Sequence, residues 1–147
     1  MNLIAQRVLS SSLYIEKKKI VSIDRGILAL VGFEKRDTSS DCKIITDKLL
    51  NYRIFPDEKG RMESSVMDIK GDLLLVPEVT LALETRKGTR PSFSEAASPD
   101  LGKKLFDELS NKLRETHDKL EVGIFGCLLY TSDAADDTPC VDLGGRR

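Results

Sequence analysis

Two uninterrupted apolar runs constrain the fold more than any other feature of this chain. The first occupies 27–33, Ile-Leu-Ala-Leu-Val-Gly-Phe, and the second occupies 73–76, Leu-Leu-Leu-Val. A strand with one solvated face alternates apolar and polar side chains, whereas a continuous run is typical of a strand that is buried on both faces. Both runs therefore predict central strands of a sheet that is covered on each side.

The residues before the first run predict short strands joined by tight turns. Three segments are rich in β-branched or aromatic residues: 3–5, 13–15 and 20–23. Ser10–Ser12 and Lys17–Lys19 separate them, so we interpret the three segments as an antiparallel meander. The three lysines either form a phosphate-binding patch or are simply solvated at a hairpin turn.

Two helices are predicted from capping residues and helical periodicity. Thr38–Asp41 offers N-cap oxygens before apolar residues at helical spacing, which predicts a helix over 39–52. Ser98–Asp100 combines an N-cap, a proline at the first helical position and an acid in the first turn, and the leucines that follow predict a helix to about Leu120. With about seven strands, the chain is predicted to be a single α+β domain, with mixed, mainly antiparallel, barrel-like sheets covered by two helices.

Composition and the N-terminal residues bear on the class of protein. The 147 residues are 40 % hydrophobic and 32 % charged, and no stretch of about 18 apolar residues is present. The first residues lack the basic segment, apolar run and cleavage site of a secretory signal. We therefore expect one cytoplasmic domain with no membrane association.

The rare cysteine and histidine residues limit the possible chemistry. Three cysteines at wide spacing, Cys42, Cys127 and Cys140, favour free thiols over a disulfide framework or a zinc site, so neither a metal nor a cofactor is expected. The single histidine, His117, lies in a charged segment and is expected at a solvated helix position. Catalysis by Ser-His-Asp or Cys-His is excluded unless that imidazole is the base.

The distribution of charge argues against broad nucleic-acid binding. Residues 128–147 hold two of the 23 basic and four of the 24 acidic residues, so the rest of the chain carries 21 basic and 20 acidic residues. Sequence-independent binding of nucleic acid needs many phosphate contacts, which a nearly neutral body does not supply. A local patch remains open, and the long loop 84–97, with three basic residues, is a candidate.

A series of landmarks matches one known family in order and spacing. They are 5–8 (Ala-Gln-Arg-Val), 31–35 (Val-Gly-Phe-Glu-Lys), 52–55 (Tyr-Arg-Ile-Phe) with Asp57, Gly60 and Met62, 85–94 (Thr-Arg-Lys-Gly-Thr-Arg-Pro-Ser-Phe-Ser) and 97–99 (Ala-Ser-Pro). On these residues the chain resembles the D-aminoacyl-tRNA deacylases, the D-tyrosyl-tRNA deacylase family, over 1–126. The resemblance implies a homodimeric hydrolase that releases D-amino acid from tRNA in translation quality control, without cofactor, membrane or DNA.

The first functional motif of that family is altered. Where the family has Ser-Gln-x-Thr after a buried strand, this chain has Pro77-Glu78-Val79-Thr80. Pro77 cannot donate a hydrogen bond to a neighbouring strand, so pairing should lapse on one side there and a pocket wall could begin. A proline at this position also resembles the animal-type deacylase, which has Pro-Gln-Ala-Thr, so deacylation of mischarged L-Ala-tRNA is an alternative function.

The resemblance implies roles for this motif and for the loop after it. Thr80 would position the ester or stabilise the oxyanion, and Glu78 would act on water as a base; the alternatives are an ordinary strand threonine and an exposed carboxylate. The substrate-binding residues implied are Pro77, Val79, Pro91, Ser92 and Phe93, of which Phe93 could instead be a core residue. The residues implied to hold tRNA phosphates are Arg86, Lys87 and Arg90, or else they form a solvated loop.

The second functional motif of the family, a Gly-Pro-containing loop near the C-terminus, is absent. Residues 127–147 instead have the composition of out-of-frame sequence and no amphipathic period. We interpret them as a non-family tail without ordered structure, following a deacylase-like domain over 1–126. The resemblance places the missing loop in the pocket of the partner subunit, so we expect weak dimerisation and impaired activity. The second functional alternative is a non-catalytic RNA-binding or interaction domain.

Overall fold

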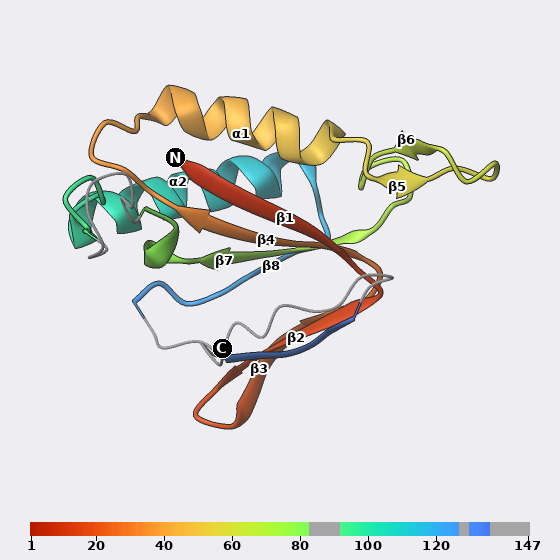
Figure 1. The fold of residues 1–147 in the computed structure, drawn as a ribbon, viewed down its shortest axis with the longest axis horizontal. Coiled ribbons are helices and arrows are strands. Elements are labelled where there is room, and N and C mark those ends of the chain that lie inside the picture. The colour runs from red at the N-terminus through yellow and green to blue at the C-terminus, as the bar shows by residue number, and fades with distance from the viewer. Residues whose placement is uncertain (83–91, 127–129, 136–147) are drawn as a thin grey trace.

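The structure is a computed structural model that describes residues 1–82, 92–126 and 130–135, the last of these as backbone only. A four-stranded sheet forms its centre, in the order β1–β4–β7–β8 (Figure 1). Its strands are β1 (Asn2–Val8), β4 (Gly26–Gly32), β7 (Asp72–Pro77) and β8 (Leu120–Val122). β1 runs antiparallel to β4, whereas β4, β7 and β8 are parallel to one another. The carboxyl ends of three strands therefore meet at one edge of the sheet.

A second sheet is antiparallel and has the order β3–β2–β9. It consists of β2 (Ser10–Ile15), β3 (Lys18–Ile23) and β9 (Tyr130–Ala135). Glu16 and Lys17 form the β2–β3 turn with φ of 49° and 65°. The predicted meander is wrong in its order, because β1 pairs with β4 and the hairpin lies in the other sheet. A strand that is apolar on both faces needs cover on both, and the hairpin provides it for β4.

The two predicted helices are present, and both begin where the capping residues place them. α1 (Ser39–Asn51) starts after Thr38, whose N–H and hydroxyl donate to Asp41 Oδ2 at 2.8 and 2.9 Å. α2 (Pro99–Thr116) starts after Ser98, whose Oγ accepts the Leu101 N–H at 3.3 Å. Both helices cover the same face of the four-stranded sheet (Figure 1).

The predicted end of the second helix is wrong, and so is the environment of His117. α2 ends at Thr116, His117 is extended at the C-cap, and Leu120 begins β8. The leucine spacing predicted a longer helix because Leu120, although it lies in β8, packs in the same core as the leucines of α2. His117 is only 7 % exposed, since the chain turns beneath the helix at this point to enter the sheet.

Shorter elements complete the fold. β5 (Phe55–Pro56) and β6 (Met62–Ser64) form a small two-stranded sheet at one end of the molecule (Figure 1). The predicted turn between them ends at Gly60, where φ is +76° and no Cβ is present to oppose it. The 3₁₀ helix η1 (Val79–Ala82) follows β7 directly. The α+β class, with mainly antiparallel pairing and two covering helices, is confirmed.

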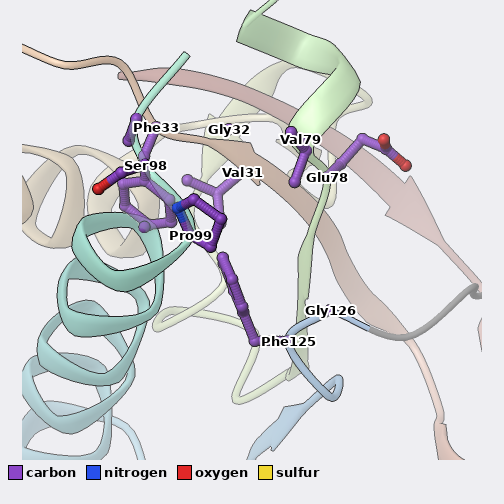
Figure 2. Close-up of a pocket in the computed structure, with 11 residues that line it drawn as sticks. Val31, Gly32, Phe33, Glu78, Val79, Ser98, Pro99, Phe125 and Gly126 are labelled. Carbon is purple, nitrogen blue, oxygen red and sulfur yellow. The ribbon is translucent and has the colours of Figure 1, made fainter.

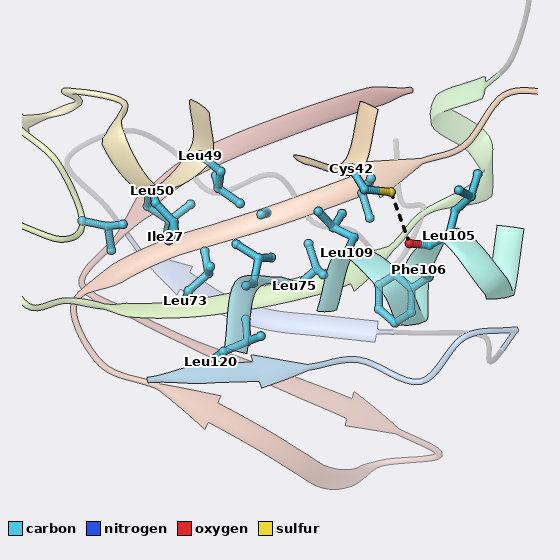
Figure 3. Packing of buried hydrophobic residues seen from close by; sticks show 14 of the residues in the cluster. Ile27, Cys42, Leu49, Leu50, Leu73, Leu75, Leu105, Phe106, Leu109 and Leu120 are labelled. Atoms are coloured by element: carbon cyan, nitrogen blue, oxygen red, sulfur yellow. Dashed lines mark hydrogen bonds between the residues drawn. The ribbon is translucent and has the colours of Figure 1, made fainter. Parts of the chain in front are cut away.

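Alternate residues of β4 and β7 enter two different cores. Ile27, Ala29 and Val31 of β4 face the helices, as do Leu73 and Leu75 of β7 (Figure 3). The intervening residues pack against Val8, Leu13 and Ile23 on the side of the second sheet; they are Leu28, Leu30, Leu74 and Val76. All seven residues of β4 are buried. The two apolar runs are therefore strands buried on both faces, as predicted.

The strand β9 differs from the expected absence of structure after residue 126. Its backbone pairs antiparallel with β2 in register Leu13↔Thr131 and Tyr14↔Tyr130. Without β9, the side of β2 that faces away from β3 would be a sheet edge with unpaired N–H and C=O groups, and such an edge readily pairs with an extended segment. The rest of the proposed tail, 127–129 and 136–147, lies outside the described residues. That the tail is foreign to the family stays a prediction.

Cys42 is predicted to be chemically inert in the folded protein. Its side chain is fully buried on α1, and its thiol donates to the Leu105 carbonyl at 3.6 Å (Figure 3). Burial raises the pKa of the Cys42 thiol from 9.0 to about 11, which lowers the thiolate fraction at pH 8 about 100-fold. Maleimide labelling at pH 8, mapped by peptide mass spectrometry, should be at least that much slower in buffer than in urea. Equal rates in both solvents would contradict this packing.

Candidate functional site

A cavity of about 190 Å³ opens at the carboxyl ends of the parallel strands (Figure 2). In open sheets with parallel strands, ligands bind beyond these ends because the loops there diverge. The end of β4 and the segments that follow β4, β7 and β8 contribute wall residues, and the start of α2 closes the remaining side. The lining residues are Val31, Gly32, Phe33, Glu78, Val79, Ala97, Ser98, Pro99, Gly102, Phe125 and Gly126.

Pairing of β7 lapses on its β8 side just before Pro77, close to the position predicted. β7 pairs with β8 only from Leu73 to Leu75, whereas its pairing with β4 continues to Pro77. The next amide, that of Glu78, donates to the Val31 carbonyl at 2.8 Å and holds the turn against β4. The chain then enters η1, which carries Val79 and Thr80 at the mouth of the cavity.

Gly32 lets η1 approach β4 closely. A Cβ at this position would lie 2.8 Å from the Glu78 carbonyl oxygen and 2.8 Å from the Leu81 Cβ. Asn2 fixes the other end of the 3₁₀ helix, because its side-chain amide donates to the Leu81 carbonyl and to Glu34 Oε1, both at 2.9 Å. The position of η1 is therefore set by backbone contacts and by one amide side chain.

One carboxylate oxygen of Glu78 accepts both donors of Thr80. The Thr80 N–H lies 3.1 Å from Glu78 Oε1, and the Thr80 hydroxyl donates to the same atom. A carboxylate thus stands beside the threonine hydroxyl, which the sequence did not reveal. The first amide of η1, that of Val79, has no acceptor within the turn, because the i→i+3 pattern begins with the Glu78 carbonyl and Leu81 N–H.

The motif lies at the surface rather than inside the protein. Val79 is 50 % exposed and lines the cavity, and Thr80 is exposed beside it without lining it. The Glu78 carboxylate points away from Pro99 and Phe125 (Figure 2). Pro77 itself is buried and does not line the cavity. The apolar part of the cavity and the polar donors of η1 are therefore neighbouring but separate regions.

The structure describes only part of the predicted loop. The segment after it is anchored beside the cavity: the Ala97 N–H donates to the Phe33 carbonyl at 2.9 Å and the Lys35 N–H to the Glu95 carbonyl at 3.0 Å. Phe93 is 53 % exposed, which excludes the alternative of core burial, and Ser92 is also exposed; neither lines the cavity. Four predicted residues, Arg86, Lys87, Arg90 and Pro91, lie outside the described residues.

Several lining residues were not anticipated as parts of a site. Pro99 was interpreted as a helix start and Phe33 as part of a buried run; both also lie in family landmarks, but neither was predicted as a site residue. Phe125, which packs against Phe106 with ring centroids 5.9 Å apart, lies beyond the last predicted element. Only the parallel order of β4, β7 and β8 reveals that these residues meet, and single-strand patterns do not encode that order.

The described side chains form neither a cluster of metal ligands nor a membrane-spanning helix. Within 1–82 and 92–126, no three His, Cys, Asp or Glu side chains come together as metal ligands would. None of the helices in these ranges has the length and apolar character needed to cross a bilayer.

Known proteins are similar in sequence to this chain over most of its length. The family model for D-Tyr-tRNA(Tyr) deacylase matches residues 4–132. The chain belongs to this family. It is 44 % identical over 136 residues to the D-aminoacyl-tRNA deacylase of Marinomonas sp. (strain MWYL1), covering 92 % of this chain and 94 % of the relative. It is 48 % identical over 126 residues to the D-aminoacyl-tRNA deacylase of Teredinibacter turnerae (strain ATCC 39867 / T7901), covering 86 % and 87 %.

Two solved structures share the architecture of this family member. One, described as a c-Myc DNA Unwinding Element Binding Protein, has a TM-score of 0.89 at 29 % identity and covers 100 % of both chains. The other, a probable eukaryotic D-amino acid tRNA deacylase, has a TM-score of 0.78 at 18 % identity and covers 88 % of this chain and 91 % of its own. The second likeness shows the fold alone.

Replacing Gly32 should damage the site more than replacing Gly102. Gly32→Ala forces a Cβ against the Glu78 backbone, so η1 must shift, at a cost of about 1–3 kcal/mol. Gly102→Ala meets only the end of the Phe125 ring, at 3.0 Å, and gains helix propensity. Urea unfolding of both variants measures the difference. Equal stabilities would show that η1 does not depend on close approach to β4.

Proposed function

We propose that this chain hydrolyses the ester bond of D-aminoacyl-tRNA at the mouth of the cavity beside η1. Membership of the deacylase family supports the reaction, and the relatives named D-aminoacyl-tRNA deacylase support the substrate. The structural observation that carries the proposal is the exposed Val79–Thr80 turn next to an apolar cavity. Backbone amides and a hydroxyl stand there beside space for a side chain.

The reaction requires little acid–base chemistry from the protein. Water adds to the carbonyl carbon, and the bond from that carbon to the ribose oxygen breaks. The ribose oxygen takes one proton of the water, the other proton passes to solvent, and the amino acid leaves as its carboxylate. This ester is already labile, so positioning and donors to the oxyanion supply the main acceleration. The Val79 amide and the Thr80 amide and hydroxyl would be those donors. A carboxylate is too weak a base to generate a threonine alkoxide, so Thr80 is proposed as a donor and not as a nucleophile.

The other residues that the resemblance implicates, in the 77–80 motif and in the loop after it, take proposed roles around this centre. Glu78 would contact the reacting ester or its water, and Pro77 would hold the turn. Pro91, Ser92 and Phe93 would complete the substrate surface, with Phe93 stacking on the terminal adenine from its exposed position. The phosphates of tRNA would be held by Arg86, Lys87 and Arg90.

Selection against L-aminoacyl-tRNA would come from rigid backbone, since exchanging hydrogen and side chain at Cα drives one enantiomer into a wall. The Gly-Pro loop that resemblance assigns to this task is absent from 127–147, so we propose that the enzyme dimerises weakly and has impaired activity. We also propose that it is cytoplasmic. A nearly neutral body favours a local tRNA contact and no DNA partner.

The enzyme is expected to deacylate D-Tyr-tRNA faster than L-Tyr-tRNA. Release of labelled D-tyrosine should exceed the buffer rate, and restoring a family-like C-terminus should increase the preference over L-Tyr-tRNA, because the missing Gly-Pro loop is the proposed wall against the L enantiomer. L-Ala-tRNA is the matched substrate for the animal-type alternative that Pro77 suggests. Loss of L-alanine alone would favour that alternative, and no loss of any amino acid, even with a family-like C-terminus restored, would leave the RNA-binding alternative.

Thr80→Ala should lower kcat at least about tenfold, because one oxyanion donor is removed. The melting temperature should change little, since Thr80 is exposed. Thr80→Ser keeps the hydroxyl and is the matched control, expected to retain most of the activity. Parallel loss of activity and of melting temperature in Thr80→Ala would assign the residue a structural role.

A further inference from the structure

Both donors that the proposed reaction requires of Thr80 are occupied. Glu78 Oε1 accepts the Thr80 amide at 3.1 Å and also the Thr80 hydroxyl. A substrate carbonyl cannot use these donors while the contact stands. The developing oxyanion also carries the same sign of charge as the carboxylate, so the two cannot share them. The carboxylate must leave Thr80 before hydrolysis proceeds.

A carboxylate that gives up two hydrogen bonds needs a replacement partner, preferably a cation. Within 1–82 and 92–126, no lysine or arginine forms an ion pair with Glu78. The substrate brings a cation of its own. The α-ammonium of an aminoacyl ester sits on the carbon next to the carbonyl carbon. When the carbonyl oxygen of the ester reaches Thr80, its ammonium group lies beside the Glu78 carboxylate.

We infer that Glu78 recognises the α-ammonium group of the aminoacyl ester, and that this ion pair releases the Thr80 hydroxyl and amide to the ester carbonyl. The inference rests on the proposed function and adds to it a specificity residue. The ammonium group replaces Thr80 as the partner of the Glu78 carboxylate. An ester without a charged amine therefore leaves the Thr80 amide and hydroxyl bound to Glu78. No covalent bond to Glu78 forms or breaks in this exchange.

A purely structural explanation of the contact predicts something different. Glu78 precedes η1, and its acceptance of the Thr80 N–H resembles an N-cap interaction. A cap contributes to stability but does not distinguish a charged from an acylated amine. Glu78→Gln separates the two explanations, because the amide keeps the size and the acceptor oxygen of the side chain and removes its charge.

The test compares D-Tyr-tRNA with N-acetyl-D-Tyr-tRNA on the full chain, its Glu78→Gln variant and a Glu115→Gln control. Glu115 is an exposed carboxylate near the C-terminal end of α2, away from the cavity. N-acetylation should lower kcat/KM about 10- to 100-fold in the wild type and the control, the range for one charge-assisted hydrogen bond. In Glu78→Gln the same penalty should fall to about threefold or less. Equal penalties in all three proteins overturn the inference.

A binding measurement separates failure of this inference from failure of the proposed reaction. The probe is D-tyrosine in amide linkage to 3′-amino-3′-deoxyadenosine, with and without an N-acetyl group, titrated by calorimetry. Weaker binding of the acetylated probe to the wild type but not to Glu78→Gln supports recognition of the ammonium even if no chain cleaves tRNA. Equal binding of both probes to the wild type, or binding of neither, overturns it. Melting temperatures of the three proteins check for the structural effect of a lost cap.

Discussion

The structure depends on the burial of β4 and β7 on both faces. Each strand sends alternate side chains into two cores, one beneath the helices and one beneath the β2–β3 hairpin. Fully burying a large aliphatic side chain contributes about 1.5–3 kcal/mol, so these strands cannot exchange a face for solvent without a large loss. Because both faces of β4 and β7 are covered, a ligand can contact these strands only at their ends. The location of the cavity follows from the packing of the core.

The geometry at that edge is controlled by the main chain more than by side chains. Pro77 ends β7, Gly32 admits η1 to contact distance, and the Glu78 amide bonds to β4. These contacts leave few degrees of freedom for the Val79 and Thr80 amides. A site of this kind requires no histidine, which is consistent with His117 being buried at the other end of α2. Preorganised amides are effective because they need no reorientation during reaction.

Local patterns predicted β1 to β4 and β7, the starts of both helices and the lapse of pairing near Pro77, since each depends on residues close in sequence. The order of the strands was not predictable in this way. The meander failed because strand pairing is a long-range property, and the end of α2 failed because Leu120 serves the same core from a strand. For the candidate site, the motif was found from resemblance, but Phe125 and Pro99 joined it only through the parallel sheet. The contact between Glu78 and Thr80 depends on the 3₁₀ geometry, which the sequence pattern of a strand does not suggest.

The resemblance implies a glutamine where this chain has Glu78, and a glutamate there would change how the proposed site works. A neutral amide oxygen beside Thr80 would compete only weakly with a substrate carbonyl, and it would not repel an oxyanion. A carboxylate competes strongly and repels the product of the first step, so it is compatible with turnover only if something neutralises it as the ester arrives. The family substrate carries its positive charge one carbon from the reacting carbonyl, where that neutralisation is required. In the proposed mechanism, glutamate at this position therefore makes turnover depend on a free amine on the substrate.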